Sequence, residues 1–159
     1  MTQGTMLEQN KASEDLKLEI TKVIKANRAR VFDAWTKPEM LHQWFGPESM
    51  TVANASVDLR VGGAYSVEVQ GSLDGKDMSR RASATGVYKK IVPNELLCFT
   101  WHGDWEPSEE TLVTVVFKDV AEGTEVTLTH ERFATAKSRS GHEHGWTSSL
   151  EKLAAFLEK

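Results

Sequence analysis

Two histidines are the side chains of this sequence best suited to proton chemistry. His130 ends an alternating apolar strand, and His142 precedes Trp146 and Leu150 at helical spacing, so both lie on faces otherwise committed to burial. A buried neutral histidine needs hydrogen-bond partners, and it can orient a ligand carbonyl or act as a general base near neutral pH. The alternative interpretation is structural, with each imidazole joining the terminal helix to the sheet.

Other catalytic and metal-binding patterns are missing from the sequence. Cys98 is the single cysteine and lies in an apolar run, which predicts a partly buried strand residue and no internal disulfide. His142 and His144 are two positions apart, so on a helix they point to different sides and do not form a zinc site without a third ligand. We predict no catalytic residue, no metal and no cofactor, and an enzyme remains the open alternative.

The composition is that of a globular protein and gives no sign of a polyanionic partner. The 159 residues carry a formal net charge of -4 with scattered basic residues, which excludes nucleic acid and an anionic membrane surface as partners. No apolar run approaches the roughly 20 residues that cross a bilayer. Residues 1–15 are polar and read as a disordered tail, leaving residues 16–159 as the domain. We expect a cytoplasmic monomer or homodimer.

The first part of the domain predicts one strand and two short helices. Residues 16–21 alternate between apolar and polar side chains, which indicates a strand with one buried face. Asn27 is an N-cap for the first helix. Thr36 is the predicted cap of the second helix, with Pro38 in its first turn.

From residue 51 the apolar period becomes two and stays so for about eighty residues, typical of consecutive strands. Turn signals separate them, among them Gly62-Gly63, Asp74-Gly75 and Glu122-Gly123. Because parallel strands need long crossovers, short turns predict an antiparallel meander of about six strands. The glycine pair after Asp58-Leu59-Arg60 joins strand to strand, so it lacks the helix terminus of a phosphate loop. A turn held by an Asp58–Arg60 ion pair is the better interpretation.

A long helix ends the sequence. Ser140 with Glu143 forms a plausible capping box, although residues 136–139 offer an earlier start. One apolar sheet face needs a cover, and only this helix is long enough. The sequence therefore predicts an α+β helix-grip fold, in which a curved antiparallel sheet of about seven strands wraps a long C-terminal helix, with two short helices after the first strand. One helix does not fill a strongly curved sheet, and we expect the remaining gap to be a pocket.

Several motifs in this order resemble the START-like (SRPBCC, polyketide cyclase, Bet v allergen-like) superfamily. Within it, the chain is most similar to the family named after the activator of the ninety-kilodalton heat-shock chaperone's ATPase. The resemblance covers residues 16–159 and is carried by Val31-Phe32-Asp33-Ala34-Trp35-Thr36-Lys37-Pro38-Glu39, Trp44-Phe45-Gly46-Pro47, Asp58-Leu59-Arg60-Val61-Gly62-Gly63-Ala64-Tyr65, Gly86-Val87-Tyr88-Lys89-Lys90-Ile91-Val92-Pro93, Phe99-Thr100-Trp101, residues 123–130 and His142-Glu143-His144-Gly145-Trp146. It implies the helix-grip fold, a ligand cavity and, through the family name, a chaperone partner.

The predicted cavity lining is large, aromatic and poor in charge, which suits a small hydrophobic or aromatic molecule. It comprises Trp44, Phe45, Tyr65, Val67, Phe99, Trp101, Val115, Phe117, Leu128, His130, His142, Trp146 and Leu150. A filled core is the alternative, because aromatic stripes are usually core. Trp44 and Phe45 are either a gate at the cavity mouth or a pin that fixes the helix to the sheet. The leading hypothesis is ligand binding, and the alternatives are a co-chaperone module and a cyclase-like or aromatase-like enzyme.

Overall fold

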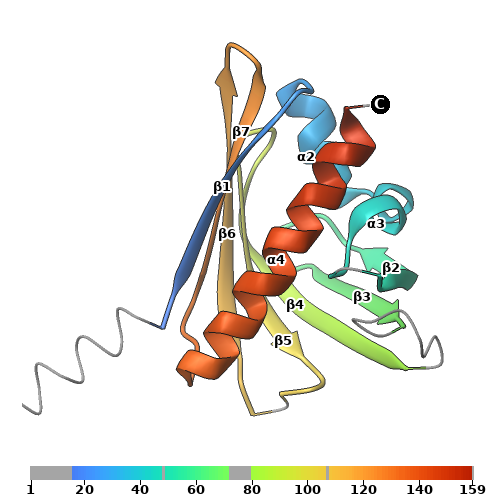
Figure 1. Ribbon diagram of the computed structural model, residues 1–159, viewed down its shortest axis with the longest axis vertical. Coiled ribbons are helices and arrows are strands. Elements are labelled where there is room, and N and C mark those ends of the chain that lie inside the picture. The colour runs from blue at the N-terminus through green and yellow to red at the C-terminus, as the bar shows by residue number, and fades with distance from the viewer. Residues whose placement is uncertain (1–15, 48, 72–79, 107, 159) are drawn as a thin grey trace, which may run out of the picture.

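Seven antiparallel strands form one curved sheet around a long helix in this computed structural model, which describes residues 16–47, 49–71, 80–106 and 108–158. The strand order is β1-β7-β6-β5-β4-β3-β2, so consecutive strands after the helices are neighbours (Figure 1). The helix-grip α+β fold expected from the sequence is confirmed. The predicted tail (residues 1–15) and the Asp74-Gly75 turn lie outside the described residues.

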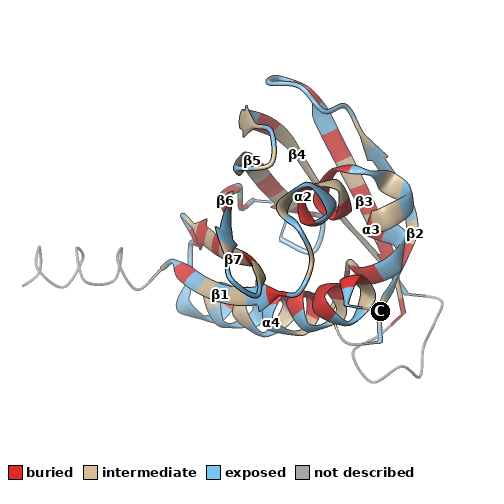
Figure 2. Ribbon diagram, turned by 90° about the horizontal axis from the view of Figure 1, so that it is seen from above, coloured by how far each residue is buried: buried red, intermediate tan, exposed pale blue. Residues whose placement is uncertain are grey.

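The elements follow the predicted order. They are β1 (Leu18–Ile24), α2 (Arg28–Thr36), α3 (Pro38–Trp44), β2 (Thr51–Val57), β3 (Ala64–Gln70), β4 (Arg81–Val92), β5 (Leu96–Gly103), β6 (Thr111–Val120), β7 (Gly123–Glu131) and α4 (Ala136–Leu157). In the view from above, the sheet curls around the space that α2, α3 and α4 occupy (Figure 2). The long helix α4 runs diagonally across the concave side of the sheet (Figure 1).

The caps of the helices agree with the sequence in one case and differ in two. Asn27 caps α2 as predicted, because its side chain accepts a hydrogen bond from the Arg30 backbone N–H. Thr36 was wrongly predicted to cap α3: its hydroxyl donates to the Phe32 carbonyl one turn back, and Lys37 occupies the cap position without a side-chain bond. Within a helix a threonine hydroxyl commonly satisfies itself in this way.

The start of α4 is not at the Ser140 capping box but at the earlier position that the sequence also allowed. The helix begins four residues earlier at Ala136, and Thr135 accepts the Ser138 backbone N–H as its N-cap. A threonine in extended conformation before the helix satisfies an N–H that the helix itself leaves free, so the earlier start has the better cap. The extra turn matters because it extends α4 along the concave side of the sheet.

The turn between β2 and β3 is held as predicted. Arg60 Nε lies 2.9 Å from Asp58 Oδ2, an exposed ion pair. Gly62 has φ +86°, which favours glycine, and a Cβ at Gly63 would lie 2.1 Å from the Asp58 carbonyl oxygen. The two glycines therefore serve the turn geometry.

The core lies between the sheet and the C-terminal half of α4. Leu150, Leu153 and Leu157 are at most 1% exposed and belong to one buried cluster with residues of the strands and of α2 and α3. The expected inward set from the strands is buried as well: Tyr65, Val67, Phe99, Trp101, Val115, Phe117 and Leu128. The N-terminal half of α4 has no comparable row of leucines.

Candidate functional site

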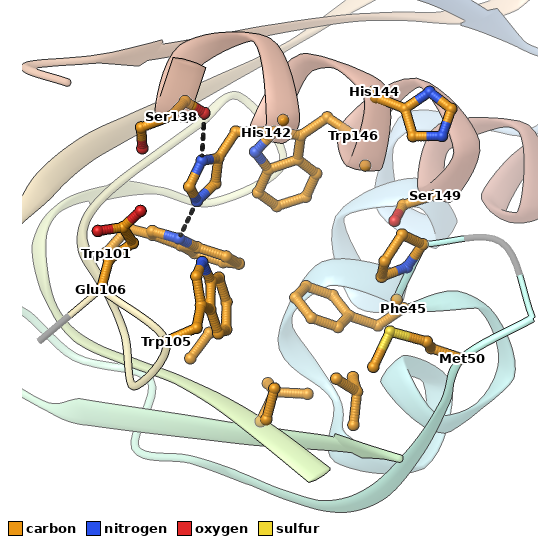
Figure 3. Close-up of a pocket in the computed structure, with 18 of the residues that line it drawn as sticks. Phe45, Met50, Trp101, Trp105, Glu106, Ser138, His142, His144, Trp146 and Ser149 are labelled. Atoms are coloured by element: carbon orange, nitrogen blue, oxygen red, sulfur yellow. Dashed lines mark hydrogen bonds between the residues drawn. The ribbon is translucent and has the colours of Figure 1, made fainter. Parts of the chain in front are cut away.

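A cavity of about 440 Å³ lies beside the N-terminal half of α4. Strands β3, β4 and β5, the segment after α3 and the β5–β6 connection form its other walls (Figure 3). Its lining consists of Phe45, Gly46, Pro47, Met50, Val67, Val69, Ala82, Ala84, Trp101, Trp105, Glu106, Thr135, Lys137, Ser138, Gly141, His142, His144, Gly145, Trp146 and Ser149. The cavity is partly open to solvent, so a ligand has a path into it.

Small residues on α4 explain why this volume is not filled. Gly141, Gly145 and Ser149 recur every four residues, so they share the side of the helix that lines the cavity. A Cβ at Gly141 would meet no atom within 4 Å, and one at Gly145 would find Pro47 Cβ at 3.7 Å. Larger side chains would fit on this side of α4, but the residues present are small.

The opposite wall is apolar. Val67 and Val69 of β3 and Ala82 and Ala84 of β4 present short aliphatic side chains toward the cavity. Alanines and valines keep the concave sheet wide at this end. Leucines or aromatics at the same positions would reach toward α4.

Aromatic side chains form the inner end of the cavity. Trp101 and Trp146 lie with their ring centroids 5.1 Å apart, and Phe45 is 6.1 Å and 5.9 Å from them. These distances are typical of favourable aromatic pairs, so the three rings hold one another in place. The ligand would meet a preformed surface.

Polar groups gather at the other end, around the first turns of α4. Glu106 comes from the β5–β6 connection, and Thr135, Lys137, Ser138 and His142 come from α4 and its cap. Apolar and polar side chains therefore both face the cavity, and Trp101 lies directly beside the polar His142 (Figure 3). A mostly apolar lining with a few polar groups is typical of small-molecule sites.

His142 is the polar side chain nearest the aromatic wall, and its tautomer follows from its partners. Nδ1 lies 2.8 Å from the Ser138 carbonyl oxygen, which only accepts, so Nδ1 carries the proton. Nε2 then accepts the indole N–H of Trp101 at 3.3 Å (Figure 3). The neutral ring is half-buried and bridges α4 to β5.

His130 lies deeper and is sealed, with no exposed surface. Trp146 donates its indole N–H to Nδ1 at 3.0 Å, and Nε2 lies 2.6 Å from the Thr111 hydroxyl, which donates onward to the Trp101 carbonyl. Burial, and secondly the neighbouring His142, hold the pKa of His130 well below its ordinary value of 6.5. The ring is thus a neutral link between β7, β6 and α4.

Glu109 fastens the β5–β6 connection to the start of α4. Its carboxylate is only 8% exposed and accepts from the Ser138 hydroxyl and the Ala134 backbone N–H, both at 2.7 Å. Bonds to a carboxylate are stronger than neutral ones. They fix the polar end of the cavity.

Lys152 fixes the wall on the opposite side. Its ammonium group donates to the backbone carbonyls of Gly46 at 2.7 Å and Met50 at 2.9 Å, and both residues line the cavity. Partial burial lowers the pKa of Lys152. The segment after α3 is therefore tied to α4 through a side chain that does not itself line the cavity.

The structure divides the predicted site residues into three groups. Phe45, Val67, Trp101, His142 and Trp146 line the cavity. Tyr65 and Phe99 lie beside a separate void of about 20 Å³. Trp44, Val115, Phe117, Leu128, His130 and Leu150 are buried in the core and line neither space.

Trp44 and Phe45 illustrate the division. The indole N–H of Trp44 donates to the Ala34 carbonyl at 2.9 Å, and the ring is 1% exposed, so Trp44 pins α3 to α2. Its neighbour Phe45 is half-buried and faces the cavity. Ligand contact by any of these residues remains a prediction.

Sequence reasoning missed several lining residues, among them Met50, Val69, Ala82, Ala84, Trp105, Gly145 and Ser149. The four-residue spacing of Gly141, Gly145 and Ser149 was a usable signal, since glycine within a helix carries a cost that a structural role can offset. Trp105 lies in a connection without periodicity, so no pattern pointed to it.

Two classes of site find no support within the described part of the chain. No group of three or more His, Cys, Asp or Glu side chains there is placed to hold a metal ion. Among the described helices, none is long and apolar enough to cross a membrane.

A family model described as "Activator of Hsp90 ATPase homolog 1-like protein" matches residues 25–158. The chain belongs to this family. The resemblance inferred from the motifs is thereby confirmed, together with its fold. Among curated proteins, none matches the chain significantly.

Several solved structures of bacterial proteins share the fold of this chain. Protein CV1439 from Chromobacterium violaceum superimposes with a TM-score of 0.79 at 26% identity, over 90% of this chain and 98% of that one. The AHSA1 protein SPO3351 from Silicibacter pomeroyi gives a TM-score of 0.76 at 26% identity, over 89% and 97%. The AHSA1-like protein from Aeromonas hydrophila, at 23% identity, gives 0.73 over 89% and 92% and supports the fold alone.

Proposed function

We propose that this chain binds a small hydrophobic or aromatic molecule in the cavity beside the N-terminal half of α4. The observation that carries the proposal is the row Gly141, Gly145 and Ser149, which leaves about 440 Å³ unfilled beside Trp101 and Trp146. Small-molecule sites commonly enclose roughly 300–1,000 Å³ with mostly apolar walls and a few polar groups. The family's helix-grip fold is consistent with this use.

The division of the walls indicates the orientation of the ligand. Its apolar body would lie against Phe45, Val67 and Trp101, and its polar end would face Ser138 and His142 near the start of α4. Because Ser138 and His142 are already fixed by hydrogen bonds, binding orders few side chains.

The same geometry favours binding over catalysis. A general base needs a free lone pair directed at the substrate. His130 is sealed and uses both ring nitrogens within the protein, and the Nε2 of His142 accepts from Trp101. The cyclase-like alternative would require His142 to exchange its tryptophan partner for a substrate.

Native mass spectrometry of the freshly purified full chain tests the proposal, followed by calorimetric titration with a panel of fatty acids and aromatic alcohols. The expected result is a retained small molecule, or binding of at least one panel member. Failure of the chain both to retain a ligand and to bind any panel member would contradict the proposal.

A matched pair of variants on α4 locates the binding. Ser149→Phe projects a ring into the cavity, whereas Thr147→Phe places the same ring on the exposed side of the helix. Ser149→Phe should abolish ligand retention, and Thr147→Phe should leave it unchanged. Equal binding by both variants would place the ligand elsewhere.

A second candidate function is contact with a chaperone, as the family description suggests. It is supported by Leu59 and Val61, which are 43% and 65% exposed on the β2–β3 turn, a place where large apolar side chains have no packing role. Stimulation of a purified Hsp90-type ATPase by the chain, and its loss in the double variant Leu59→Ser with Val61→Ser, would support this function. Absence of stimulation would remove it.

A further inference from the structure

Trp105 differs from the other tryptophans at the cavity in its exposure. It is 47% exposed, whereas Trp101 and Trp146 are 7% and 4% exposed. Trp105 belongs to the β5–β6 connection and lines the cavity near the polar end (Figure 3). A half-exposed indole forgoes much of the burial energy that a tryptophan offers. Its position therefore needs a reason within the fold.

The backbone of β5 provides a seat for this indole. A Cβ built at Gly103 would lie 2.6 Å from Cε2 and Cζ2 of Trp105, so the six-membered ring rests directly on a glycine. Any other residue at position 103 would push the ring away. The end of a strand thus sets the position of a side chain that belongs to the following connection.

His142 restrains the indole from the side of α4. The two ring centroids are 6.0 Å apart with a tilt of 33°. His142 cannot turn freely, because its two nitrogens are bonded to Ser138 and Trp101. Trp105 is therefore held at the cavity before any ligand arrives.

Phe45 lies on the other side of the cavity (Figure 3). Its ring is fixed by contacts with Trp101 and Trp146. Within the described residues no ring contact joins Phe45 to Trp105, although both line the cavity, so the two rings face it without packing on one another. Two fixed aromatic rings that line one cavity and do not touch offer two surfaces to a flat guest.

We propose that Trp105 and Phe45 hold a planar aromatic ring system between them. This inference rests on the proposed ligand-binding function and names the class of ligand. A flat ring meets both side chains in the stacked or edge-to-face geometries that aromatic pairs prefer, and each such pair adds about two- to twelvefold to affinity beyond the buried area. A saturated ring or an acyl chain gains only the area term.

Two compounds with one carbon skeleton test the ligand class by calorimetric titration of the full chain. 2-Naphthol is planar and aromatic, and decahydro-2-naphthol carries the same hydroxyl on a puckered saturated skeleton. We expect the wild-type chain to bind 2-naphthol more tightly. Trp105→Ala should weaken the binding of both compounds through lost contact area, and it should weaken 2-naphthol binding about two- to twelvefold more than decahydro-2-naphthol binding, because only the aromatic compound also loses a ring pair. Trp105→Phe should retain most of the affinity.

A second variant tests whether the position of the Trp105 ring matters as well as its presence. Gly103→Ala keeps Trp105 but displaces its ring, and it should reproduce the selective loss for 2-naphthol. Val23→Ala, at an exposed site on β1 that does not line the cavity, is the control and should change neither affinity. Because Trp105 is half-exposed, Trp105→Ala should fold, which thermal unfolding of each variant verifies.

The outcomes distinguish this inference from the proposed function. An equal loss for both compounds in Trp105→Ala would make Trp105 an ordinary apolar wall and overturn the inference while leaving ligand binding intact. Unchanged 2-naphthol binding in Trp105→Ala would overturn it as well. If the wild-type chain binds neither compound, the ligand class is wrong, and the separate panel of fatty acids then decides whether the proposed function survives.

Discussion

The two halves of α4 face the same sheet but meet it differently. The C-terminal half places Leu150, Leu153 and Leu157 into a closed core, whereas Gly141 and Gly145 of the N-terminal half, followed one turn later by Ser149, face an open cavity. A single helix in a curved sheet therefore makes both a core and a cavity, and side-chain size along the helix decides where one gives way to the other. The C-terminal half of α4 contributes most to stability, and the N-terminal half borders the proposed binding site.

The two tryptophan–histidine pairs repeat this contrast. Trp146 donates to His130 in the sealed interior, and Trp101 donates to His142 at the edge of the cavity. Each pair joins α4 to the sheet by an indole N–H and a neutral imidazole. Only the pair at the cavity has a ring that a ligand can reach.

The largest expected difference is in the free energy of unfolding, between truncating a side chain of the closed core and truncating one at the cavity wall. Leu153→Ala removes a side chain with no exposed surface and should lower the free energy of unfolding by about 2–5 kcal/mol, because it leaves a void in a packed core. Met50→Ala, at the half-buried cavity wall, should cost less than about 1 kcal/mol. Urea unfolding of both variants checks this, and equal losses would contradict the division into closed and open halves.

Removing the indole N–H should cost more free energy of unfolding in the buried tryptophan–histidine pair than in the pair at the cavity. Trp146→Phe leaves the Nδ1 of His130 buried without a donor, which should cost about 1–3 kcal/mol in addition to lost packing. Trp101→Phe should cost less, since the ring of His142 is half-buried and solvent can replace the lost donor. Both free energies of unfolding are measurable in urea. A larger loss for Trp101→Phe would contradict the assignment of His130 as the sealed member.

Low pH should destabilise the folded chain, because His130 is buried in its neutral form. The pKa of His130 is held well below 6.5 in the folded chain, so below about pH 6.5 the unfolded state binds a proton that the folded state does not. The stability that the neutral ring contributes is therefore present above this pH and is lost as the pH falls, by up to about 1.4 kcal/mol per pH unit. Urea unfolding from pH 7 to pH 5 should show this slope in the wild type and a shallower one in His130→Gln. Identical slopes would show that His130 does not contribute.

The smallest expected effect concerns the glycines of the open half. Gly141→Ala should raise the free energy of unfolding by up to about 1 kcal/mol, because alanine is the better helix former and its methyl group would meet no atom within 4 Å. Gly145→Ala should gain less, since its methyl group approaches Pro47. Thermal unfolding measures both, and destabilisation by Gly141→Ala would mean that the helix face is not open.

Much of the architecture could be predicted because local signals agreed with the tertiary structure. Within the described residues, the strands expected between residue 51 and His130, the cap at Asn27 and the Asp58–Arg60 turn all appear. The predicted caps at Thr36 and Ser140 were wrong because a neighbouring backbone group or an earlier threonine made the better bond. Such competition among adjacent residues is not visible in a pattern.

The candidate site was predictable only in part. Period-two patterns identify which strand residues face inward, so Val67, Val115 and Leu128 were all placed correctly inside. Whether an inward residue meets α4 or the cavity depends on the size of the helix residue opposite, which lies far away in sequence. Val67 faces small residues of α4 and lines the cavity, whereas Leu128 is enclosed by the core.

The proposed site exists only if the space beside Gly141, Gly145 and Ser149 is free of protein side chains. The free energy of unfolding of Ser149→Phe, measured in urea without added ligand, tests this most directly. If the cavity accepts the new ring, the variant should be as stable as the wild type or more stable, because the ring buries apolar surface without displacing neighbours. A loss of about 1–3 kcal/mol, the usual effect of overpacking a filled core, would contradict the account.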